Sequence, residues 1–160
     1  MPQSIVEALR YIHVLFGVGW VGEVATIVFV VIPAASSAPP EARSYLFGTV
    51  FPRLFLLASV LGGVAIAAGA ALYLATFQRH GGMGSTWSSL VLGGGTLAGA
   101  LYLFHLFQES RGEARLAATL ARADDPAGVE AALAKLRKVP RVGLVVLAIV
   151  VGLMVAAASL

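Results

Sequence analysis

Four long apolar stretches, separated by polar segments, make up most of the chain. They cover residues 8–32, 54–77, 87–107 and 142–160, and the last three contain no Asp, Glu, Lys or Arg. An apolar stretch of about 20 residues is long enough to cross a bilayer as a helix. The pattern therefore predicts an all-α integral membrane protein, a single domain over residues 1–160 in which four helices form a bundle.

The first two connections between these stretches are of different kinds. Residues 33–53 are rich in Ala, Ser and Pro, whereas residues 78–86 form a short Gly-rich segment that predicts a turn. The start of the chain carries Glu7 as well as Arg10, and the first apolar stretch is longer than the apolar run of a signal peptide. We therefore expect it to remain in the mature protein as the first span.

The third connection, residues 108–141, is long and alternates charged residues with Ala and Leu. This composition favours a helix that continues the third span into solvent. Asp124 and Asp125, followed by Pro126, predict a break and the start of a second, short helix, because Asp caps helix starts and Pro is favoured at the first helical position. We expect this second helix to rest on the membrane surface.

The basic residues fall mainly on one side of the predicted membrane. Nine of the eleven lie in the first and third connections: Arg43, Arg53, Arg111, Arg115, Arg122, Lys135, Arg137, Lys138 and Arg141. The other two, Arg10 and Arg79, lie on the opposite side. The positive-inside rule then predicts a multi-pass protein of the plasma (inner) membrane, with the helical loop 108–141 in the cytoplasm and both termini outside.

Composition narrows the chemistry that this chain can perform. With 59% hydrophobic and 12% charged residues, its composition is unlike that of a soluble globular protein. The absence of Cys excludes disulfides, thiolate chemistry, iron–sulfur clusters and covalent CxxCH haem attachment. The net charge is +3, but the basic loop contains no aromatic residues between its basic ones, so we expect no nucleic-acid partner. Three histidines remain as nitrogen ligands for a metal.

His13 is the first of these and lies near the outer edge of the first span. Gly17 and Trp20 follow at i+4 and i+7, so the three residues share one stripe of the helix. An imidazole that binds haem iron needs flat space beside it, which Gly17 provides, and Trp20 could line the macrocycle. The alternative is a histidine that is hydrogen-bonded to another helix. The GxGxxG string at residues 17–22 lacks the strand and turn of a dinucleotide-binding site.

The other two histidines lie at different depths. His80 follows the second span on the outer side, so it is our predicted second iron ligand, with a loose surface histidine as the alternative. His105 is 18 residues beyond Trp87, close to the inner face, and cannot share an iron with His13. His105 and Glu109 form an i, i+4 pair that makes at most a weak metal site, and interface anchoring is the alternative.

Glu23 is the one formal charge deep inside a span. A charged side chain there costs at least ~2.5 kcal/mol unless it is paired, protonated or hydrated. We consider a proton relay, a partner for a buried cation, an oligomer contact, and a neutral Glu that is hydrogen-bonded inside the bundle. Arg53, directly before the second span, is the nearest cation in sequence that could form a pair with it.

Residues 9–22 read LRYIHVLFGVGWVG, a pattern LRxxHxxxGxxWxG. This segment resembles the first helix of a group of small membrane proteins that includes the CopD-like copper-resistance proteins, the HemJ-type protoporphyrinogen oxidases and the membrane domain of PuuD-type urate oxidases. The resemblance implies haem at His13. The HemJ-like enzymes have a functional Lys in a later helix, which has no counterpart here because Lys135 and Lys138 lie in the predicted loop. The clustered Met and His residues expected of a copper carrier are also missing.

Taken together, these features predict a b-type haem protein of the membrane with a redox role, holding haem b at His13 and His80 and exchanging electrons with a quinol or another electron-transfer partner. It would be a haem oxidoreductase if it is an enzyme. The alternative is a cofactor-free accessory or scaffolding subunit that packs through its Gly-rich helices against a larger complex. We expect the protein to be a homo-oligomer or a subunit of a complex. A proton-coupled or metal transporter that uses Glu23 and His105 is the third hypothesis.

Overall fold

The chain folds into helices almost throughout. The computed structural model describes residues 2–120 and 126–160, without the side chains of Pro40, Ser44, 108–129, Ala132, Lys135 and Leu136. Its elements in chain order are α1 (Gln3–Thr26), η1 (Ile27–Val31), α2 (Ile32–Ser37), α3 (Pro40–Tyr45), η2 (Leu46–Val50), α4 (Phe51–Thr76), η3 (Phe77–His80), α5 (Thr86–Leu120) and α6 (Pro126–Ala158). The described residues include no strand, so the predicted all-α fold is confirmed.

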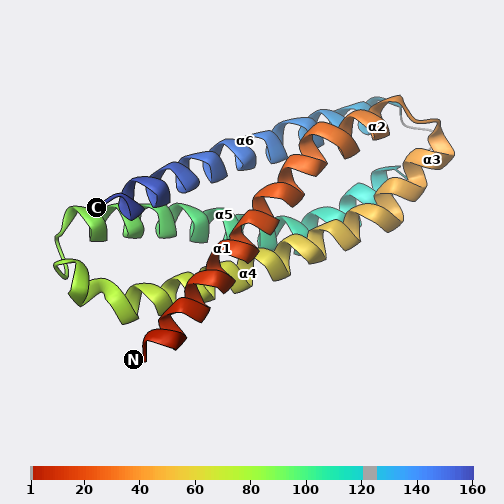
Figure 1. The fold of residues 1–160 in the computed structure, drawn as a ribbon. Helices are drawn as coiled ribbons and strands as arrows, with labels where there is room; N and C mark the ends of the chain where they lie inside the picture. The colour runs from red at the N-terminus through yellow and green to blue at the C-terminus, as the bar shows by residue number, and fades with distance from the viewer. Residues whose placement is uncertain (1, 121–125) are drawn as a thin grey trace.

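These elements join into four long helices. The first runs from Gln3 to Ser37 and the second from Glu41 to His80, while α5 and α6 form the third and fourth. Each contains a stretch that is long and apolar enough to cross a membrane. Figure 1 shows α1 crossing α4 obliquely and α5 beside α6. We call the end with both termini and the 81–85 turn the terminal end, and the end with the α2–α3 turn the loop end.

The predicted first connection, residues 33–53, is helical apart from a break at Ala38 and Pro39. Two segments with π-helical hydrogen bonding, η1 and η2, interrupt the α-helices here, and each lies just before a proline, Pro33 and Pro52 respectively. A proline ring collides with the carbonyl four residues earlier, and a wider turn at that place relieves the collision. The prolines therefore remain inside the helices instead of ending them.

The fourth helix also differs from the prediction. It does begin at Pro126, but it continues without interruption to Ala158 and contains Pro140, so there is no separate short helix at the membrane surface. Leu133 explains the difference, because it is only 3% exposed and packs into a cluster with Ile27, Phe47 and Phe51 of the first two helices. This contact holds the start of α6 against the bundle. Asp124 and Asp125 lie outside the described residues.

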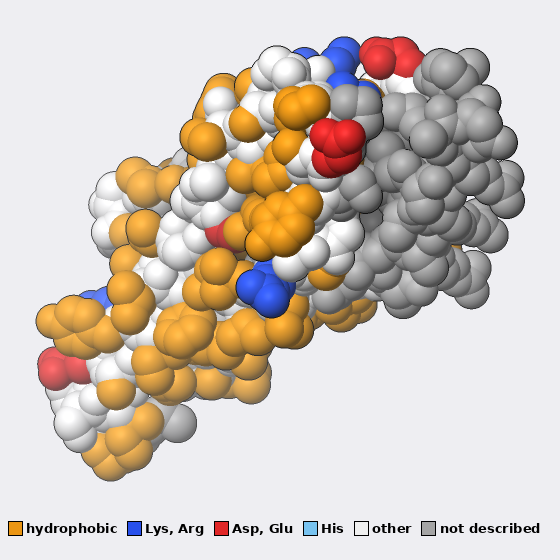
Figure 2. All heavy atoms as spheres, turned by 90° about the vertical axis from the view of Figure 1, so that its right-hand side faces the viewer, with side chains coloured by type: hydrophobic (Ala, Val, Ile, Leu, Met, Phe, Trp, Pro, Cys, Tyr) orange, Lys and Arg blue, Asp and Glu red, His pale blue; other side chains and the backbone are white. Residues whose placement is uncertain are grey.

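A second buried cluster holds the middle of the bundle together. It consists of one residue from each long helix: Trp20, Ala58, Ala98 and Leu147. Small residues allow the close approach, since a Cβ on Gly62 of α4 would lie 3.1 Å from the Trp20 ring. On the outside, apolar side chains cover most of the described part of the face in Figure 2, as expected for helices surrounded by lipid.

Candidate functional site

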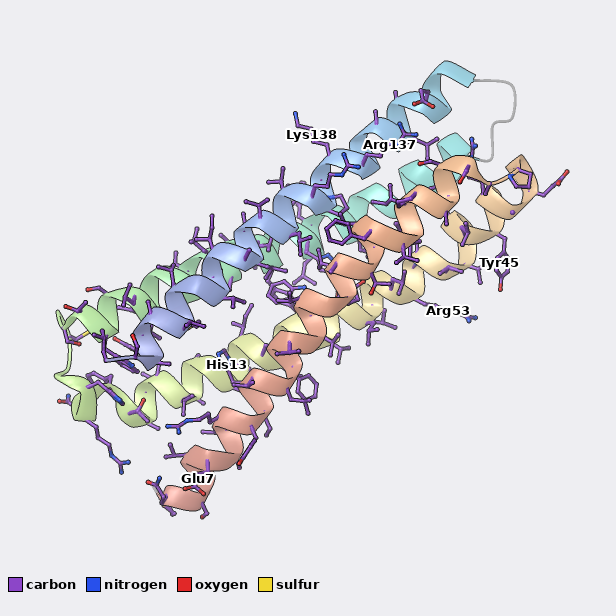
Figure 3. All side chains as sticks on the ribbon, turned by 45° about the horizontal axis from the view of Figure 1, so that its top comes forward. Glu7, His13, Tyr45, Arg53, Arg137 and Lys138 are labelled. Atoms are coloured by element: carbon purple, nitrogen blue, oxygen red, sulfur yellow. The ribbon has the colours of Figure 1, made fainter. Side chains whose placement is uncertain are left out.

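His13 connects α1 to α4 where the two helices cross (Figure 3). Its Nδ1 lies 2.8 Å from the carbonyl oxygen of Ala65. A carbonyl oxygen can only accept, so Nδ1 carries the hydrogen and donates it, and Nε2 is left with a free lone pair. Gly69 makes this contact feasible, because a Cβ there would lie 2.7 Å from His13 Cε1. The hydrogen bond to another helix is therefore present, and it leaves one ring nitrogen able to bind a metal.

The helix surfaces near His13 carry few side-chain atoms. A Cβ on Gly17, one turn further along α1, would meet no atom within 4 Å, and the same holds for Gly95 of α5. Helices α4 and α5 run antiparallel, with Tyr73 beside Ser88 and Gly62 beside Tyr102. This register places Gly95 at about the level of Gly69, and Gly69 contacts His13. Gly95 is exposed and Gly17 is partly exposed, so the space that they leave open at this level is at the surface of the bundle.

Trp20 and Tyr102 lie on the loop-end side of this level. Trp20 is 4% exposed, and its ring meets the Tyr102 ring edge to face with centroids 6.1 Å apart. The Tyr102 hydroxyl donates to the carbonyl oxygen of Ser59, at 3.0 Å. Gly62 and Gly63 leave room for these aromatic rings on α4. The predicted stripe His13, Gly17 and Trp20 therefore faces the bundle, with Tyr102 as an additional member from α5.

His80 does not meet His13. It lies in η3, is exposed, donates from Nδ1 to the carbonyl oxygen of Thr76 at 3.1 Å, and stacks on Trp87 with ring centroids 4.2 Å apart. His13 contacts α4 at Gly69, which precedes His80 by eleven residues, or about 16 Å along a helix. At this separation the two imidazoles cannot both bind the same iron. Stacking on Trp87 accounts for the position of His80.

His105 lies on the seam between α4 and α5, toward the loop end. Its Nε2 is 3.0 Å from the Ser59 hydroxyl and 3.2 Å from the carbonyl oxygen of Phe55, and its ring packs near the Phe55 ring. Ser59 precedes Gly69 by ten residues, about 15 Å along α4. This agrees with the expectation that His105 and His13 cannot share an iron. The side chain of Glu109, its predicted partner, lies outside the described residues.

Glu23 is buried without a partner. It is 7% exposed, and neither carboxyl oxygen has a hydrogen-bond partner in the part of the chain that the structure describes. Arg53 is exposed and points away from the bundle in Figure 3, so the predicted Glu23–Arg53 pair does not form. The helix turn that carries Arg53 directs it outward, because Phe51 and Leu54 of the same turn face the core. Glu23 is thus a buried polar group without a hydrogen-bond partner among the described residues.

Sequence reasoning missed the polar contacts between α4 and α5. Ser59 and Tyr102 meet toward the loop end, and Tyr73 meets Ser88 toward the terminal end, with 2.8 Å between the two hydroxyl oxygens. The spacing of Tyr102 and His105, i and i+3 in an apolar span, was a usable signal for one polar face. Their partners on α4 could not be found without the register between the helices.

The arrangement of possible metal ligands limits which cofactors the site could hold. Within residues 2–120 and 126–160, no group of three or more His, Cys, Asp or Glu side chains is arranged to hold a metal ion. A metal ion that needs three such side chains therefore has no site among these residues, whereas haem, which brings four of its own nitrogens, needs only one histidine. No family model matches the chain, and no curated protein or solved structure is significantly similar to it.

Proposed function

We propose that the protein is a b-type haem protein of the membrane and that His13 is the axial ligand. The observation that carries the proposal is the hydrogen bond from His13 Nδ1 to the Ala65 carbonyl. Histidines that bind metals through Nε2 almost always donate their other ring hydrogen to a carbonyl or carboxylate, which fixes the tautomer and the ring orientation. The donor set suits haem with a single histidine from this chain, because His80 lies too far away along the helix.

In this proposal the chain's residues position and shield the cofactor. Ala65 and Gly69 hold the imidazole in place, Gly17 and Gly95 leave room for a flat ring, and Trp20 supplies an apolar wall. Haem supplies one-electron exchange, and we infer a redox role with a membrane quinol pool or another electron-transfer partner. Nine of the eleven basic residues belong to the first and third predicted connections, which favours an inner-membrane topology with both termini outside and haem toward the outer side.

Reduced-minus-oxidised absorbance of protein purified in mild detergent tests the proposal. After growth with ample haem we expect a Soret and an α band, and we expect His13→Ala to abolish or shift them. His80→Ala and His105→Ala are the matched controls and should keep the wild-type spectrum. A colourless wild-type preparation, or a His13→Ala spectrum identical to that of the wild type, would refute the proposal.

A second function is favoured by a different observation, the uncovered glycines of α5. Gly93, Gly95 and Gly99 would each meet no atom within 4 Å if they carried a Cβ. Small residues that are not used inside a bundle allow another membrane helix to approach closely. This favours a cofactor-free accessory subunit that packs against a larger complex. Copurification decides between the two functions, because a colourless protein with stoichiometric partners supports the second and a coloured homo-oligomer supports the first.

A further inference from the structure

Glu23 lies well inside the first long helix, on the face that points into the bundle. It follows Trp20 by three residues and precedes Ile27 by four, and both of these are buried. The helix that carries it runs from Gln3 to Ser37, so Glu23 is 20 residues (about 30 Å) from one helix end and 14 residues (about 21 Å) from the other. At this depth a bilayer offers no water and no counter-ion.

The register between α1 and α4 places Glu23 near a buried apolar residue. His13 meets Gly69 and Gly19 meets Leu61, and the antiparallel register that these contacts set brings Glu23 to about the level of Ala58. Ala58 is buried and belongs to the central cluster with Trp20. A carboxylate ion in such a place has nothing to offset the loss of its hydration, whereas a protonated carboxyl carries no charge.

The ionisable side chains of the neighbouring helices do not neutralise this carboxyl. On α4 the nearest cation is Arg53, which points away, and on α5 Tyr102 and His105 are hydrogen-bonded to α4. The fourth helix has no ionisable residue from 142 to its end at Ala158, and on α1 the next one is His13, ten residues or about 15 Å away. Among the described residues, Glu23 therefore forms no ion pair.

We propose that Glu23 is a proton-binding site within the membrane, where its carboxyl takes up and releases a proton. A metal cation is a poor alternative ligand, because hard cations require about six oxygen ligands and no cluster of three acidic or histidine side chains is present in the described residues. A proton requires one oxygen. A carboxyl with a purely structural role would be hydrogen-bonded, as nearly all buried polar groups are, and both Glu23 oxygens lack a partner within the described chain.

The backbone changes geometry just after Glu23. The π-helical segment η1, which precedes Pro33, starts at Ile27, and the Ile27 amide is shared between the carbonyl oxygens of Glu23 and Val24. The helix geometry is therefore altered within one turn of the carboxyl. The proposal does not depend on haem, since it concerns a residue about 15 Å from His13 along the helix.

Infrared difference spectroscopy of the full chain in lipid vesicles tests the proposal. At neutral pH we expect a carbonyl stretching band of a protonated carboxyl, and we expect it to shift when the buffer is exchanged for D2O. Glu23→Gln should remove the band, while Glu23→Asp should retain a protonated-carboxyl band at a changed frequency. Glu7→Gln is the matched control, because Glu7 lies on the same helix but is exposed, and this variant should keep the wild-type band.

Two outcomes would overturn the proposal. One is a wild-type spectrum at neutral pH without any protonated-carboxyl band, which would mean that Glu23 is ionised. The other is a Glu23 band that stays unshifted after prolonged exposure to D2O, which would mean that the proton does not exchange. Both measurements use wild-type protein, and the changed frequency in Glu23→Asp assigns the band if Glu23→Gln fails to fold.

Discussion

Replacing Gly69 with Ala tests the contact that holds α1 against α4. A Cβ at this position would lie 2.7 Å from Cε1 and 2.8 Å from Nδ1 of His13, which is closer than carbon and nitrogen atoms can approach. The imidazole must therefore move away, and its hydrogen bond to Ala65 is lost. Gly95→Ala is the matched control, since its Cβ would meet no atom within 4 Å.

The expected cost follows from two effects. Inserting a methyl group into a packed contact destabilises by about 1–3 kcal/mol, and an interhelical hydrogen bond in a membrane protein contributes about 0.6 kcal/mol on average. Ala is favoured over Gly in a helix by roughly 0.5–1 kcal/mol, but this gain applies to both variants and cancels between them. We therefore expect Gly69→Ala to be less stable than Gly95→Ala by about 1–3 kcal/mol.

Unfolding by dodecyl sulfate in mixed micelles measures this difference, with the fluorescence of the two tryptophans as the signal. The Gly69→Ala transition should occur at a lower dodecyl sulfate fraction than that of Gly95→Ala. Equal midpoints, or a higher midpoint for Gly69→Ala, would show that His13 does not pack against α4 as described.

Two further predictions concern packing at the other levels of the bundle. Tyr102→Phe removes the hydroxyl that donates to the Ser59 carbonyl and should lower stability by about 0.6 kcal/mol, up to roughly 1.7, in the same unfolding assay; an unchanged midpoint would argue against the bond. Leu133→Ala removes most of a side chain that is 3% exposed in the buried cluster at the loop end, and it should lower the free energy of unfolding by about 2–5 kcal/mol. Leu103→Ala, at an exposed position of α5, is its control and should have a much smaller effect; similar losses for both would contradict the docking of α6.

The sequence predicted part of the candidate site. His13, Gly17 and Trp20 could be assigned to one stripe, because helical periodicity determines which residues share a face. Gly69 and Ala65, the groups that orient His13, could not be assigned, since any of several small residues of the second span could have met the first. The expected pairing of His13 with His80 failed for the same reason, because their separation depends on where α1 crosses α4.

The sequence likewise predicted only part of the fold. That the chain forms four long apolar helices followed from the sequence alone, because a segment in lipid must satisfy its backbone hydrogen bonds internally. Where those helices end did not follow, since Pro33 and Pro52 look like features of a connection and are accommodated by η1 and η2. Only the tertiary structure decided that Leu133 docks against the first two helices and that Glu23 is buried without a partner among the described residues. Local periodicity sets the face of a helix, but crossing angle and register between helices depend on side-chain packing over the whole bundle.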